Sequence, residues 1–206
     1  MADSFGISHL KEYFIKMGLK ISQVDQEREV IELAFHGNYG QWRMIVGFQQ
    51  SGDVRKLMLV VPQFATITNK KRMECMEALM AVNYRIAMGK FGIDLEDGEI
   101  RLEETIPLAD NIISYSQFQL IFGAIMQTVA IYYNLLPRII HTNTPILEVI
   151  RTCEQDFFQD GNEPTQAAGG NTHLPGSIQQ IEDDGSDLDV NDVLEEVTRL
   201  LRQGRD

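Results

Sequence analysis

This 206-residue chain has only two cysteines, and its 18 basic residues are outnumbered by 30 acidic ones. Its N-terminal residues do not resemble a signal sequence. Its two cysteines, Cys75 and Cys153, are far apart and form no CxxC pair, which argues against a disulfide framework or a zinc site. The N-terminal letters MADSFGISHLKEYF show no basic region, apolar stretch and cleavage site, so we expect a cytoplasmic protein. The net charge of -12 disfavours nucleic acids and anionic membranes as partners, because both would repel the chain.

Catalytic and metal-binding motifs are also missing from the sequence. The histidines fall in four different segments without HxH or HExxH spacing; they are His9, His36, His141 and His173. The carboxylates between Glu96 and Glu104 lack the spacing of a calcium-binding EF-hand loop. We therefore expect no metal, no cofactor and no enzymatic activity. An enzyme stays an alternative, since an active site assembled from scattered residues leaves no motif.

Negative charge is concentrated at the C-terminal end of the chain. From Glu154 onward, thirteen acidic residues stand against three arginines, whereas the preceding region is close to neutral. Between Gln159 and Ser186 the sequence offers few large apolar residues to offset the entropy of ordering. We predict a folded domain over 1–158, a flexible linker over 159–186, and a disordered acidic tail over 187–206 that ends in an amphipathic helix.

The folded part begins with a helical pattern and continues with three strand patterns. A helix is predicted over 8–17, where Leu10, Phe14 and Met17 share a face. Apolar residues then alternate with polar ones over 31–35 and 42–48, and the intervening Gly37 to Gly40 indicates a hairpin. A more continuously apolar run follows over 57–61, and Pro62 is predicted to end it. The pattern predicts a three-stranded antiparallel meander.

A methionine-rich helix, a second hairpin and further helices complete the predicted domain. The helix is expected over 69–90. Asp97-Gly98 then suggests a two-residue turn that would place Leu95 opposite Ile100 and Ile93 opposite Leu102. A long helix is expected from Ser114 to about Leu135, and a shorter one begins at Thr144-Pro145.

The segment 111–137 contains no charged residue, so a membrane span is one interpretation. Seven polar residues interrupt it, however, without visible partners; they are Ser114, Ser116, Gln117, Gln119, Gln127, Thr128 and Asn134. A helix buried against a sheet or a second subunit explains the same composition, and we adopt that interpretation.

The meander, the methionine-rich helix, the LEDGEIRLEETIPL hairpin and the long helix together resemble the YbjN family over about residues 5–140. This family shares the fold of the type III secretion chaperones. The resemblance implies an α+β domain with an antiparallel sheet packed on helices, commonly dimeric. It also implies a chaperone-like or regulatory protein, since such chaperones hold extended client segments along apolar surface. It brings no invariant functional residue.

Two features are candidates for binding a partner. The methionine stripe Met73, Met76 and Met80 would offer a flexible, polarisable surface, although a plain core or a dimer seam is the alternative. In the tail, helical periodicity over 187–202 gathers the apolar residues Val193, Leu194, Val197, Leu200 and Leu201. Ser186 and Asp189 resemble a capping box for this helix. The helix could dock on a partner, fold back onto its own domain or pair with its copy in a dimer.

The sequence therefore predicts a non-enzymatic, homodimeric protein-binding module that engages a client or regulatory partner through apolar surface. The alternative is a dimeric scaffold or assembly factor whose acidic C-terminal helix recruits a partner complex.

Overall fold

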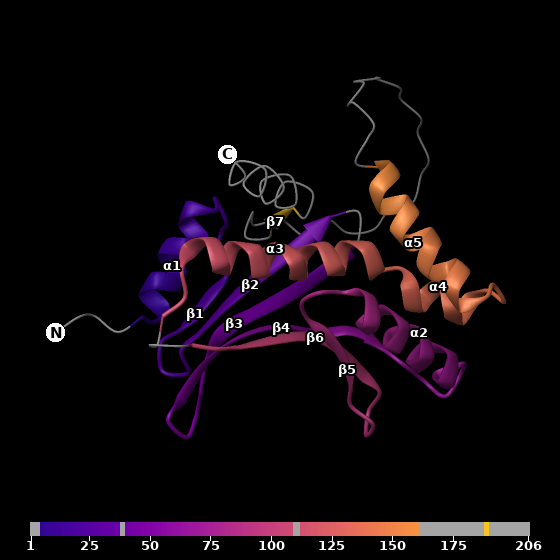
Figure 1. Cartoon of the computed structure of the whole chain (residues 1–206), viewed down its shortest axis with the longest axis horizontal. Helices are drawn as coiled ribbons and strands as arrows, with labels where there is room; N and C mark the ends of the chain where they lie inside the picture. The colour runs from indigo at the N-terminus through magenta and orange to yellow at the C-terminus, as the bar shows by residue number, and fades with distance from the viewer. Residues whose placement is uncertain (1–4, 38–39, 109–111, 161–187, 190–206) are drawn as a thin grey trace, which may run out of the picture.

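The computed structural model of the chain describes residues 5–37, 40–108, 112–160 and 188–189 (Figure 1). Strands and helices follow one another in the order α1 (Ile7–Lys16), β1 (Gln23–Asp25), β2 (Val30–Gly37), β3 (Gly40–Ser51), β4 (Val54–Thr66), α2 (Arg72–Arg85), β5 (Lys90–Ile93), β6 (Glu99–Pro107), α3 (Tyr115–Tyr132), α4 (Leu135–His141), α5 (Ile146–Asp160) and β7 (Leu188–Asp189). This is an α+β domain, as the sequence predicts.

The strands form one sheet in the order β1-β2-β3-β4-β6-β5, and every neighbouring pair along this path is antiparallel. Alternate residues point to opposite faces of such a sheet. On one face the strand residues are almost fully buried; examples are Ile31, Leu33, Met44, Val46, Leu57, Leu59, Val61 and Leu102. The other face carries charged and half-buried apolar residues. Among the residues that the structure describes, the core therefore lies on the first of these faces.

Helices α1 and α3 lie on the same side of the sheet and cover its apolar face (Figure 1). Phe14 of α1 packs edge-on against Phe118 and Phe122 of α3, with ring centroids 5.3 and 5.7 Å apart. Helix α3 begins at a capping box, in which the Gln117 amide donates to Ser114 Oγ (3.2 Å) and Gln117 Oε1 accepts from the Ser114 amide (3.1 Å). The uncharged segment is thus a core helix with a defined start.

By length and composition alone, the stretch Tyr115–His141 could cross a membrane. In this fold 61% of its most apolar 18-residue window is buried inside the protein. Its apolar character is therefore accounted for by packing against the sheet, which is the interpretation adopted from the sequence.

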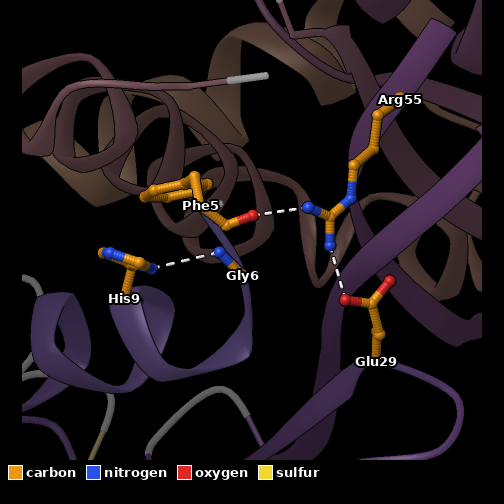
Figure 2. Close-up of polar contacts among 5 residues, drawn as sticks. All are labelled: Phe5, Gly6, His9, Glu29 and Arg55. Carbon is orange, nitrogen blue, oxygen red and sulfur yellow. Dashed lines mark hydrogen bonds and ion pairs between the residues drawn. The ribbon is translucent and has the colours of Figure 1, made fainter. Parts of the chain in front are cut away.

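An arginine fastens the N-terminal segment to the sheet (Figure 2). Arg55 on β4 donates from one guanidinium nitrogen to the Phe5 carbonyl oxygen and from the other to Glu29 Oε1, at 2.5 Å each. Its guanidinium also lies over the Phe48 ring, 4.1 Å from the centroid. Beside it, His9 Nδ1 accepts a hydrogen bond from the Gly6 amide (3.1 Å) at the start of α1. These contacts fix where α1 begins.

The predicted meander is confirmed, with two corrections. Strand β1 was not predicted, because its three residues are too few for an alternation to be recognised. Strand β4 does not end at Pro62 but continues to Thr66. The pairing with β6 is interrupted after Val61 and resumes at Ala65, and Gln63 between them adopts a positive φ of 49°. A bulge therefore carries the strand past the proline.

The predicted register of the second hairpin is wrong. Ile93 pairs with Ile100 and Phe91 with Leu102. The Asp94 amide also donates to the Glu99 carbonyl (2.9 Å), so the loop between these two residues holds four residues, 95–98, instead of two. The reason is local: Asp94 Oδ1 accepts from the Glu96 amide (2.8 Å) and the Asp94 carbonyl accepts from the Gly98 amide (2.9 Å). These bonds start the turn at Asp94 and leave Leu95 exposed.

The methionine-rich helix is shorter than predicted at both ends. It begins at Arg72, because Lys71 adopts a left-handed conformation (φ 53°), and it ends at Arg85, since Ile86 is extended. The long helix predicted from Ser114 to about Leu135 is α3, which ends at Tyr132, and a short helix that was not predicted, α4, follows from Leu135. Helix α5 follows the predicted proline and buries Val149, Ile150 and Cys153.

Of the predicted linker and tail, the structure describes Gln159, Asp160 and the strand β7. Leu188 and Asp189 pair with β2, so the predicted helix does not include them and Asp189 does not act in a capping box there. The apolar residues predicted for the tail helix lie outside the described residues; they are Val193, Leu194, Val197, Leu200 and Leu201.

Candidate protein-binding surface

Helix α2 presents large apolar side chains to solvent. Met73 is 72% exposed, Met80 69% and Tyr84 93%. Together with the exposed Glu77 they lie within an arc of about 60° on the helix, given a rotation of about 100° per residue. We call the three apolar residues Met73, Met80 and Tyr84 the α2 stripe. An exposed apolar patch of this kind is typical of a surface that contacts another protein.

The opposite side of α2 packs into the domain. Its buried residues are Cys75, Ala78, Leu79 and Val82, which face the core, while Met76 at the flank is half-buried. The α2 stripe is therefore not left over from an incompletely formed core. The helix already has one apolar face in use and carries a second one outward.

The N-terminus of α2 is attached to the end of α4. The Lys71 ammonium donates to the Ile139 carbonyl (3.0 Å), to Asn143 Oδ1 (3.2 Å) and to the Thr142 carbonyl. Carbonyls at the C-terminal end of a helix carry partial negative charge, which a lysine neutralises. The left-handed backbone of Lys71 is thus held by a contact between two helices.

The C-terminus of α2 is attached to α5. Arg85 Nη1 lies 3.0 and 3.2 Å from the two carboxylate oxygens of Glu154, and the buried Tyr132 hydroxyl on α3 donates to the same carboxylate (2.9 Å). Burial, followed by the hydrogen bond to Glu154, raises the pKa of Tyr132 above its ordinary value. The stripe is therefore displayed on a helix that is anchored at both ends.

The two cysteines, Cys75 on α2 and Cys153 on α5, are both buried and free. Burial is the largest cause that raises the pKa of each thiol; for Cys75 the neighbouring Glu74 raises it further. A raised pKa keeps a thiol protonated and poorly nucleophilic. Within the described parts of the chain, no group of three or more His, Cys, Asp and Glu side chains is placed to hold a metal ion.

The uncovered face of the sheet is the second exposed surface. One row crosses the six antiparallel strands, from β1 to β5, through Gln23, Glu32, Ile45, Val60, Glu103 and Lys90. Its apolar centre is half-buried, and ion pairs flank it on both sides, Arg43 with Glu32 (3.1 Å) and Arg101 with Glu103 (2.9 Å). Because Glu32 and Glu103 are already paired within the sheet, this face offers less to a partner than the α2 stripe.

The sequence-predicted methionines are thus separated by the fold. Met73 and Met80 are exposed together, whereas Met76 is turned toward the domain. Tyr84 was missed, although its position eleven residues after Met73 and four after Met80 places it on the same helical face. The tail residues proposed for partner binding lie outside the described chain.

The fold defines an α+β domain with one antiparallel sheet, helices on one face and an apolar helix surface. Residues 9–137 match the sequence model of the YbjN family, described as "Putative bacterial sensory transduction regulator". The chain belongs to this family.

Among solved structures, it is similar to a crystal structure described as "YbjN, a putative transcription regulator from E. coli". The match has 10% sequence identity and a TM-score of 0.41, and it covers 61% of this chain and 89% of that one. The comparison with curated proteins gives no match.

Proposed function

We propose that this YbjN-family protein is a non-enzymatic regulatory module that binds another protein through the α2 stripe. The observation that carries the proposal is the exposure of Met73, Met80 and Tyr84 on one face of a helix whose other face is buried. Methionine and tyrosine are enriched in protein interfaces, where methionine adapts its shape and tyrosine supplies contact area.

The anchoring of α2 supports the same proposal. Lys71 holds one end of the helix and Arg85 the other, so the stripe loses little further freedom when a partner binds. The family description as a regulator of sensory transduction agrees with a protein whose output is an interaction. Its mechanism is burial of the stripe in a complementary apolar surface, without covalent chemistry.

The test is a comparison of two double variants in the cell that makes the protein. Met73→Gln with Met80→Gln removes the two methionines of the stripe, while Ile15→Gln with Leu95→Gln alters two apolar residues of nearly equal exposure, 67% and 69%, elsewhere on the surface. A partner that co-purifies quantitatively with the native chain should be lost from the first variant, by about tenfold or more, and retained by the second.

Equal retention by both variants would contradict the proposal. Equal loss from both would also contradict it, because binding would then depend on general surface polarity and not on α2. Unfolding curves of both variants should stay close to that of the native chain, since all four positions are exposed.

A further inference from the structure

The outer edge of β2 is shared by two short strands. Strand β1 pairs antiparallel with Val30 to Glu32, and β7 pairs parallel with the far end, where Leu188 lies opposite Phe35 and Asp189 opposite His36. Strand β1 is too short to cover β2 beyond Leu33. The segment that completes this edge comes from the opposite end of the chain.

Three hydrogen bonds establish which backbone groups of β2 face outward. The Glu32 carbonyl accepts from the Ser22 amide (3.0 Å), and the Ala34 amide donates to Ser22 Oγ (3.0 Å), so both face the β1 side. The Glu29 carbonyl accepts from the Phe48 amide (3.1 Å) and faces β3. Because these directions alternate along a strand, the amide of His36 faces outward, toward β7.

An unpaired strand edge is costly and hazardous for a protein. Its amides and carbonyls recruit any extended chain that can pair with them, including a second copy of the same protein. Here the edge beyond β1 meets Leu188–Asp189 of its own chain. The 27 residues 161–187 separate this segment from the end of α5 and are ample to reach it, since an extended chain spans about 3.3 Å per residue.

We propose that the outer edge of β2 over Ala34 to His36 is a strand-docking site whose occupant is the chain's own Leu188–Asp189 segment. The tether favours this occupant over a separate molecule, because it holds the segment at an effective concentration on the order of millimolar. Docking closes this stretch of the edge to other strands. This role is independent of the α2 stripe.

Amide hydrogen exchange of the full chain tests the proposal. The double substitution Leu188→Pro with Asp189→Pro removes two backbone donors and disfavours pairing, whereas Leu188→Val with Asp189→Thr keeps a strand-compatible backbone. The His36 amide should exchange at least about tenfold faster in the proline variant and at the native rate in the Val/Thr variant. The amides of Leu33 and Phe35 face β3 and should be unchanged in both.

Unchanged exchange at His36 in the proline variant would overturn the proposal. If that variant loses protection at Leu33 and Phe35 as well, the substitutions have disturbed the whole strand, and the proposal is then tested in the unmodified chain. There, a nuclear Overhauser contact between the His36 amide and Leu188 supports docking, and its absence overturns it. In a mixture of nitrogen-labelled and carbon-labelled chains, a contact between different chains would identify a second copy as the occupant and would also overturn the proposal.

Discussion

Arg85 on α2 and Glu154 on α5 form an ion pair in which one guanidinium nitrogen lies within 3.2 Å of both carboxylate oxygens. The same carboxylate accepts the hydrogen bond of the buried Tyr132 hydroxyl. One side chain therefore links α2, α3 and α5.

Replacing Glu154 should weaken this junction. Glu154→Ala leaves the Tyr132 hydroxyl buried without its acceptor, and we expect the free energy of unfolding to fall by about 2 kcal/mol, mostly from that hydroxyl and less from the partly exposed ion pair. Urea unfolding measures the change. Gln155→Ala, at the neighbouring exposed position of α5, is the control and should change stability by less than about 0.5 kcal/mol.

Alkaline pH should destabilise the protein through Tyr132. Its pKa is raised in the folded state, so above about pH 10 the unfolded chain releases this proton while the folded chain retains it. The contribution is fully present below that pH and is lost as the pH rises toward the folded pKa. Unfolding curves between neutral and alkaline pH should show the decline. Tyr132→Phe should reduce its slope, and an identical slope in that variant would contradict the assignment.

A methyl group at Gly98 should distort the second hairpin. Gly98 has φ +78°, and an added Cβ would lie 2.3 Å from the Ile67 carbonyl oxygen. We expect Gly98→Ala to lower the free energy of unfolding by roughly 2 to 4 kcal/mol, from backbone strain and overpacking together. Gly92→Ala in the adjoining strand is the control, since its Cβ would meet nothing within 4 Å. Thermal unfolding of the pair gives the comparison, and equal stabilities would refute it.

The two thiols should be unreactive in the native protein. Cys75 and Cys153 are buried, and burial raises the pKa of both, so the reactive thiolate is scarce and inaccessible. Ellman's reagent should modify both thiols rapidly in denaturant and only slowly in native buffer. Rapid modification of the native chain would show that α2 or α5 opens locally.

Periodicity predicted the central elements of the fold because each is governed by its own local pattern. The alternation over 31–35 and 42–48 led directly to β2 and β3. The second hairpin was misregistered because the side chain of Asp94, and not the Asp97-Gly98 pair alone, starts the turn. The length of α2 could not be predicted, since its start depends on Lys71 reaching carbonyls about 70 residues away in the chain.

The sequence predicted the candidate surface only in part. Composition indicated the methionines as candidates. Which face of α2 is buried depends on its packing against α4 and α5, so the sequence alone could not distinguish the half-buried Met76 from the exposed Met73 and Met80. Tyr84 is not a methionine and so was not among the residues selected from composition; its exposure became evident only once the buried face of α2 was known.

Helix α2 is held at both of its ends, by Lys71 at the N-terminus and by Arg85 at the C-terminus. A push on the stripe would be transmitted by Lys71 to the turn between α4 and α5, and by Arg85 to the middle of α5. Helix α5, which Arg85 contacts through Glu154, leads directly into the C-terminal part of the chain.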